Sequence, residues 1–346
     1  MPDESGPLPS TDAERSDEIR RVVNAASTEL RQRHPWLRHQ DAIGAGILAF
    51  ALTGMVACGY GYIQGVMPAW LVIPLVAFFA SLTHELEHDL IHWMYFRKRP
   101  WAHHLMMALV WLARPSTINP WVRRELHFEH HKFSGTMQDR EERGITNGER
   151  WGLPRLLMLA DAGFSVWWRI RRIPDAAQRR KLWKRALTIY FPLGWIHWGA
   201  WYAFLLAHAT LGLAAMFGFA LQEPAGLAVL DTVVVIWIAP NVLRSFCLHF
   251  VSSNMHYFGD VEPGNVIQQT QVLNVWWLLP FQAFCFNFGG THAIHHFVVK
   301  EPFYVRQLTA RTAHRVMREM GVRFNDLANF RRANRWNDSV STGAAG

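Results

Sequence analysis

The sequence predicts an all-α integral membrane protein, with four transmembrane helices in two hairpins and a cytoplasmic helical cap that carries clustered histidines. Three observations lead to this prediction. Two long stretches lack charged residues, lysine and arginine are confined to three segments, and histidines recur at helical spacing close to the ends of the apolar stretches.

The two apolar stretches are each long enough for a pair of membrane passes. Residues 42–83 contain no Asp, Glu, Lys or Arg, and neither do residues 186–222. The second stretch continues to Arg244 with Glu223 and Asp231 as its only charged residues. About 20 apolar residues span a bilayer. Turns are expected at "GYGYIQGVMPA" and "LQEPAG", where glycine and proline interrupt the pattern.

The distribution of basic residues predicts the orientation. All 35 Lys and Arg residues lie in residues 1–41, in residues 85–185, or from Arg244 onward. The positive-inside rule therefore places both turns outside and both termini in the cytoplasm, most simply in a bacterial inner membrane. The net charge of +8 fits attraction to anionic lipids. Nucleic acid is not an expected partner, because no compact basic patch or recognition motif is present.

Three regions are expected along the chain. Residues 1–40 form a cytoplasmic leader and a charged helix, residues 41–300 a membrane catalytic domain, and residues 301–346 a cytoplasmic tail ending in "NDSVSTGAAG", which has a disordered composition.

Three further apolar or aromatic segments are not expected to cross the membrane. "AHHLMMALVWLA" is too short. "VWWRIRRIPDAAQRRKLWKR" is typical of an interfacial helix. "NVWWLLPFQAFCFNFGG", at residues 274–290, is interrupted by Pro280 and is expected to lie flat or re-enter.

The first histidine cluster reads "HELEHDLIH" at residues 84–92. His84 and His88 are four residues apart, so they share one helical face. With Glu85 as a base they also match the H-E-x-x-H signature of zinc proteases. His92 repeats the step but lies about 80° from His84 around a helix, so it is an alternative ligand in place of His84.

Two more clusters, "HFEHH" and "HAIHH", share one spacing. Positions i, i+3 and i+4 direct three imidazoles to one side of a helix. A single zinc uses three or four protein ligands and would leave at least four of the clustered histidines without a role. Two metal ions can use all of them, and imidazole suits iron among other transition metals. The histidines of these two clusters are His127, His130, His131, His292, His295 and His296.

The alternatives are an intramembrane zinc protease using His84, Glu85 and His88, or a histidine-lined metal transporter. A transporter would need ligands within the passes, which are nearly free of polar groups.

The three clusters resemble the histidine boxes of the membrane fatty acid desaturase and hydroxylase superfamily, over about residues 40 to 300. The resemblance implies two non-haem iron ions, molecular oxygen as co-substrate, and oxidation of an unactivated C–H bond in a lipid or fatty-acyl chain. It also implies a ninth histidine, which "SSNMHYFGD" supplies as His256. The two-residue gap between His127 and His130 resembles desaturases more than alkane hydroxylases. Desaturation is therefore the expected outcome, and hydroxylation of an alkyl or lipid chain is the alternative. The expected metal ligands are His84, His88, His127, His130, His131, His256, His292, His295 and His296, with no further catalytic residue.

Residues beside the ligands are expected to play at most supporting roles. Glu85, Asp89 and Glu129 adjoin ligands and could accept a ring N–H, or simply be solvated. His103, His104 and His249 are expected to be interfacial or supporting groups.

The chain has no cysteine cluster, haem segment or dinucleotide-binding turn. A separate electron donor, such as a ferredoxin or rubredoxin with its reductase, is therefore expected to dock on the basic face of residues 97–185.

Overall fold

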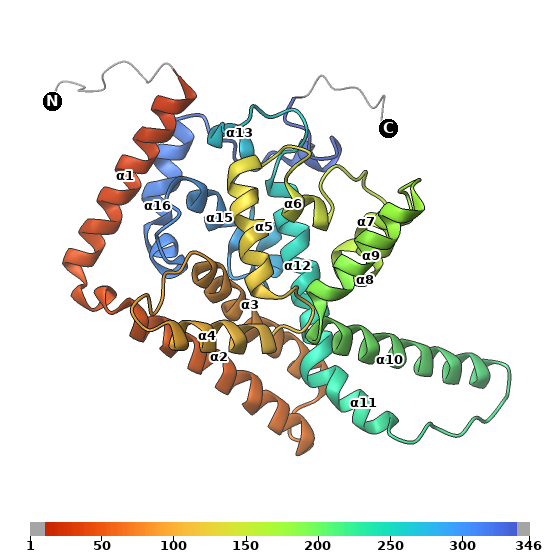
Figure 1. The fold of residues 1–346 in the computed structure, drawn as a ribbon. Coiled ribbons are helices and arrows are strands. Elements are labelled where there is room, and N and C mark those ends of the chain that lie inside the picture. The colour runs from red at the N-terminus through yellow and green to blue at the C-terminus, as the bar shows by residue number, and fades with distance from the viewer. Residues whose placement is uncertain (1–10, 338–346) are drawn as a thin grey trace, which may run out of the picture.

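The structure, a computed structural model, describes residues 11–337 and is built from helices (Figure 1). Across these residues the only β pairings are two isolated bridges, His256 with Thr270 and Val272 with Phe324. The predicted all-α class is therefore confirmed. Residues 1–10 of the expected leader, and all of "NDSVSTGAAG" after its first residue, lie outside the described residues.

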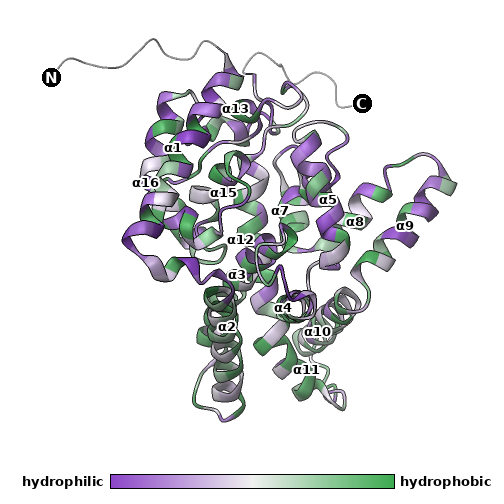
Figure 2. Cartoon of the chain, turned by 60° about the vertical axis from the view of Figure 1, so that its left-hand side comes forward, coloured by the Kyte–Doolittle hydropathy of each residue, from purple (hydrophilic) through white to green (hydrophobic). Residues whose placement is uncertain are grey.

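Four helices are long and apolar enough to cross a membrane, as predicted. A helix of 24 residues is about 36 Å long, which exceeds the ~30 Å hydrocarbon core of a bilayer. Figure 2 shows hydrophobic residues concentrated along these helices, and hydrophilic residues over α1 (Asp12–Arg33) and α9 (Ala176–Tyr190). The four are α2 (Gln40–Ile63), α3 (Ala69–Ile91), α10 (Leu193–Met216) and the continuous helix Leu227–Met255, which comprises α11 (Leu227–Val233), a π-helical turn η2 (Val234–Ile238) and α12 (Ala239–Met255).

The connections between these helices fall where glycine and proline predict turns. Gly65, between α2 and α3, has a φ of +70°, which glycine adopts without strain. α2 packs along α3, whereas α10 and α11 project away from the rest of the molecule side by side (Figure 1). None of the most apolar window of α10 is buried by protein, which is expected of a helix that faces lipid. The side of the membrane that each end faces stays a prediction.

The segments expected not to cross are short or broken. α4 (Pro100–Leu112) has 13 residues. The basic aromatic segment is divided between α8 (Ala162–Ile170) and α9 on either side of Pro174. Residues 274–290 contain two short helical segments, of three and five residues, and the first turn of a third helix. The remaining elements are η1 (Pro35–Arg38), α5 (Pro120–Phe133), α6 (Arg140–Ile145), α7 (Leu153–Ala160), α13 (Val266–Gln269), η3 (Trp276–Leu278), α14 (Leu279–Ala283), α15 (Phe288–Phe297), α16 (Phe303–Glu319) and η4 (Leu327–Phe330).

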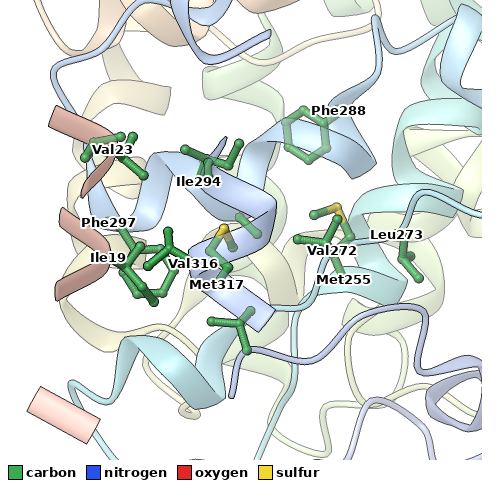
Figure 3. Close-up of a cluster of buried hydrophobic side chains, with 14 of the residues drawn as sticks. Ile19, Val23, Met255, Val272, Leu273, Phe288, Ile294, Phe297, Val316 and Met317 are labelled. Atoms are coloured by element: carbon green, nitrogen blue, oxygen red, sulfur yellow. The ribbon is translucent and has the colours of Figure 1, made fainter. Parts of the chain in front are cut away.

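A hydrophobic cluster joins the two ends of the chain to the histidine-bearing region. Ile19 of α1, Met317 of α16 and Ile294 of α15 are buried together (Figure 3). α16 also contributes Arg306, whose Nη2 lies 3.2 Å from Oδ1 of Asp89 on α3. Contacts thus cross both boundaries predicted near residues 40 and 300, and the terminal helices brace the helices that carry the boxes.

Candidate metal centre

The first box is an extension of a membrane helix. α3 begins as an apolar helix, and every residue from Ala80 to Ile91 is buried, including His84 and His88. His92 is the residue that ends the helix. The box therefore stands at the end of a helix that other segments surround.

The other two boxes lie on short helices with well-defined starts. The side chain of Asn119 accepts a hydrogen bond from the backbone N–H of Trp121, and Pro120 occupies the first turn, so α5 starts where the sequence favours it. α15 follows Asn287, which is in the left-handed region with a φ of +55°. His256 follows the last residue of α12.

The structure gathers eight histidines into two groups of four. Within each group the possible ligand nitrogens all lie within 4.8 Å of one another. Nε2 of His127 is 3.0 Å from Nε2 of His92, and Nε2 of His292 is 3.2 Å from Nε2 of His296. Two imidazoles bound to one metal at about 2.1 Å have nitrogens about 3.0 to 3.4 Å apart, so this spacing fits a metal between them. Group A is His88, His92, His127 and His295, and group B is His130, His256, His292 and His296.

Seven of the nine histidines expected as ligands belong to these groups, and two do not. Nε2 of His131 lies 3.1 Å from Nε2 of His127 and 3.0 Å from Nε2 of His295, so His131 adjoins group A. His84 lies outside both groups, with Nδ1 3.5 Å from Nη1 of Arg114. In the first box, His92 therefore lies beside the second and third boxes and His84 does not, because His84 is two helical turns from the end of α3, where His92 meets α5. Which of the two binds a metal stays a prediction.

A run of acidic residues, which the sequence analysis did not single out, supports the groups. Nδ1 of His127 lies 2.8 Å from Oε2 of Glu141, and Nδ1 of His130 lies 2.9 Å from Oδ2 of Asp139. Rings that donate Nδ1–H to these carboxylates turn the lone pair of Nε2 towards the group, as is usual for metal-binding histidines. Oδ1 of Asp139 also caps α6 by accepting from the N–H of Glu142 at 3.3 Å. The signal in the sequence is "DREE", eight residues after "HFEHH".

The carboxylates that the sequence analysis did single out have other contacts. Oε2 of Glu85 lies 3.7 Å from Arg306, and Asp89 accepts hydrogen bonds from Arg306, from the hydroxyl of Tyr95 and from the N–H of Phe303. Glu129 is 39% exposed and faces Arg140. Among the described contacts, none of the three accepts a hydrogen bond from a histidine ring.

Burial keeps most of these imidazoles neutral, and only a neutral imidazole offers a lone pair to a metal. Burial lowers the pKa of His92 to about 2 and that of His256 to about 3. At His130 burial also lowers the pKa, but the carboxylate of Asp139 outweighs it and raises the pKa to about 9. Burial would raise the pKa of Glu141, yet His127 and Arg123 hold it well below its usual range. Burial likewise lowers the pKa of His131, His292, His295 and His296.

Buried nitrogens without a partner give a further test of whether a metal fits. Nε2 of His130 and Nε2 of His256 have no hydrogen-bond partner, and neither ring nitrogen of His88 has one. Buried polar atoms are nearly always satisfied. A metal ion would give Nε2 of His130, Nε2 of His256 and one nitrogen of His88 a partner, and an all-imidazole donor set suits iron among other transition metals.

A cavity of ≈ 230 Å³ leads to the histidines from between α5, α6, α8, α9 and α12. Histidines of both groups line it, including His88, His130 and His292. Its walls are mainly apolar, so it can admit a hydrocarbon chain. The apolar lining includes Ile118, Leu126, Ile145, Met158, Val166, Ile189 and Leu248.

Fold and site together define a helical membrane protein with two adjacent histidine groups beside an apolar cavity. The sequence model of the fatty acid desaturase family matches residues 64–328. The chain therefore belongs to the fatty acid desaturase family, whose members are oxidoreductases that act on lipid chains. No curated protein matches the chain. The zinc-protease alternative gains no support, since His84 and His88 do not share a group within the described residues.

Proposed function

We propose that this protein is a membrane di-iron oxidoreductase that uses molecular oxygen to form a double bond in a lipid or fatty-acyl chain. One observation carries the proposal. Two groups of four histidines, spaced for two metal ions, contribute His88, His127, His130 and His292 to the lining of a mainly apolar cavity.

The proposed reaction balances with an external reductant. Two hydrogens leave adjacent carbons, and with O₂, two electrons and two protons they yield the alkene and two molecules of water. Bound iron would supply oxygen activation and hydrogen abstraction. The two histidine groups, with His131 beside them, would hold the two irons. Glu141 and Asp139 orient His127 and His130, and the cavity walls position the chain and exclude water.

The proposal also covers the orientation of the enzyme in the membrane and the source of its electrons. The active site and both termini face the cytoplasm of a bacterium, and a separate ferredoxin or rubredoxin with its reductase delivers the electrons. The middle box, with two residues between His127 and His130, favours desaturation, and hydroxylation is the alternative outcome of the same chemistry.

Lipid profiling tests the proposal. The gene is expressed in a bacterial host, and total fatty acids and hydrocarbons are compared with those of an empty-vector strain and of the His292→Ala variant. New double bonds that require the wild-type gene, together with about two irons per purified chain, are expected. New hydroxyl groups would instead establish the alternative. One bound zinc with peptide cleavage, and no change in lipids, would refute both.

A further inference from the structure

An arginine is buried in the wall of the cavity without a carboxylate partner. Arg244 of α12 is 1% exposed and lines the cavity. Its Nη2 donates to the hydroxyls of Ser245 at 2.9 Å and Ser116 at 3.3 Å. Its Nη1 is buried and has no hydrogen-bond partner.

The orientation of this guanidinium is fixed by its neighbours. Nε of Arg244 donates to Oδ1 of Asn241 at 3.2 Å. The amide of Asn241 in turn donates to the carbonyls of Trp237, at 2.9 Å, and Ala113, at 3.1 Å. Trp237 lies in the π-helical turn, whose irregular carbonyls Asn241 helps to satisfy. The arginine is therefore held in place before any ligand arrives.

The other arginines that line the cavity are neutralised. Arg123 forms ion pairs with Glu87 at 3.0 Å and Glu141 at 3.2 Å, and Arg140 faces Glu129 at 3.7 Å. Among the described residues, no carboxylate lies within ion-pair distance of Arg244. A buried charge without a counter-ion costs several kcal/mol, so such a site favours an incoming anion.

We infer that Arg244, with Ser116 and Ser245, binds the carboxylate of a free fatty acid whose chain extends to the histidine groups. This inference rests on the proposed function. Nη1 of Arg244 keeps two free N–H groups, which can form charge-assisted hydrogen bonds to a carboxylate. The hydroxyls of Ser116 and Ser245 hydrogen-bond to each other at 3.0 Å, so one of the two has a further O–H to donate. The rest of the cavity is mainly apolar, which suits the hydrocarbon part of the same molecule.

The position of Arg244 would also determine where the chain is oxidised. Arg244 lies on α12 and His256 directly follows that helix, 12 residues later, which corresponds to about 18 Å along the helix axis. Ser116, which contacts Arg244, is two residues from Arg114, which contacts His84. Because head group and histidines are held at a fixed separation, oxidation would occur at a fixed carbon counted from the carboxylate.

Binding and turnover of matched ligands test the inference. Saturated fatty acids of three lengths, with their methyl esters, are tested against the full chain in detergent for binding and in membranes for oxidation. The wild type should bind the acid at least about 30-fold more tightly than the ester. Arg244→Met should abolish this preference, and Arg244→Lys should retain part of it. Arg172→Met, which removes a surface arginine paired with Glu149, should leave the preference unchanged.

The possible failures are distinguishable. Equal binding of acid and ester by the wild type, or a product position that stays constant when counted from the methyl end, would overturn the inference. So would equal losses for acid and ester in a folded Arg244→Met protein. Preferential binding of the acid with no oxidation of any chain would support the anion site and refute the proposed function.

Discussion

The histidines of the two groups depend on their positions along the helices, and His127 and His130 depend also on carboxylates that fix their rings. His92 illustrates the first point, because it lies at the C-terminal end of α3 with Nε2 3.0 Å from Nε2 of His127. His84, two turns earlier, faces Arg114 and Phe288. His84, His88 and His92 follow one another at four-residue steps, yet His88 and His92 belong to group A and His84 belongs to neither group.

These two histidines give the first prediction. His92→Ala should reduce iron content to about half of the wild-type value, because group A loses one of four ligands. His84→Ala, on the same helix, is the matched comparison and should keep its iron. Iron and protein are quantified on purified chains. If the His84 variant loses iron while the His92 variant keeps it, the ligand assignment drawn from the structure is wrong.

The second prediction concerns the carboxylate that orients His127. Glu141→Gln should weaken iron binding by about 10- to 100-fold, because an amide oxygen is a weaker acceptor for the ring N–H. Competition with a graded series of chelators measures the affinity. Glu129→Gln is the control, since Glu129 lies near the surface. A loss of the same size in both variants would argue against an orienting role for Glu141.

At the scale of secondary structure, the third box depends on close packing at the start of α15. A Cβ on Gly289 would lie 2.6 Å from the carbonyl oxygen of Leu273 and would also clash with the side chain of Gln282. The N–H of Leu273 donates to the carbonyl of Gly289 at 2.9 Å. This approach of two backbones positions the helix that carries His292, His295 and His296.

The third prediction follows from this packing. Gly289→Ala should destabilise the protein by about 1–3 kcal/mol, since backbone atoms must shift to admit the methyl group. It should also lower iron content, because the histidines of α15 move with the helix. Thermal unfolding in detergent and metal analysis measure the two effects. Gly212→Ala on α10 is the control, because among the described residues no neighbouring atom lies within 4 Å of the place its methyl group would occupy.

At the scale of the whole molecule, the basic residues predict which ends of the helices face the cytoplasm. Val66 and Glu223 are exposed and lie in the two turns, and Arg180 is exposed on α9. The three native cysteines are buried, which makes single introduced cysteines informative.

The fourth prediction uses these positions. An impermeant maleimide applied to intact cells should label Val66→Cys and Glu223→Cys, and should label Arg180→Cys only after lysis. Labelling is measured by gel shift, with the unsubstituted chain as the background control. Labelling of Arg180→Cys in intact cells would reverse the proposed orientation.

The fifth prediction concerns the electron donor. If an acidic protein docks on the basic surface of residues 97–185, turnover supported by that donor should fall as salt rises, because charges are screened over about 8 Å at physiological ionic strength. Turnover is assayed across a salt series with ferredoxin or rubredoxin and a reductase, and with a small-molecule reductant as the control. A donor-supported rate independent of salt would count against electrostatic docking.

Local patterns along the chain were enough to predict the all-helical class, the four apolar spans and most of the histidines of the two groups. Spans are fixed by the length of apolar runs, and the shared face of His127, His130 and His131 is fixed by the 3.6-residue helical period. Both signals lie within short segments and need no knowledge of how the helices pack.

The remaining features of the site arise from contacts between distant segments, which depend on how the helices pack. That His92 and not His84 lies beside His127 depends on where α5 crosses the end of α3. The roles of Asp139 and Glu141 depend on the turn after α5, which brings them back to the rings. The sequence alone predicts that Arg244 lies at the basic end of a membrane span. Its burial with no carboxylate beside it depends on how the surrounding helices pack. Such contacts join residues far apart in the chain, and no helical period encodes them.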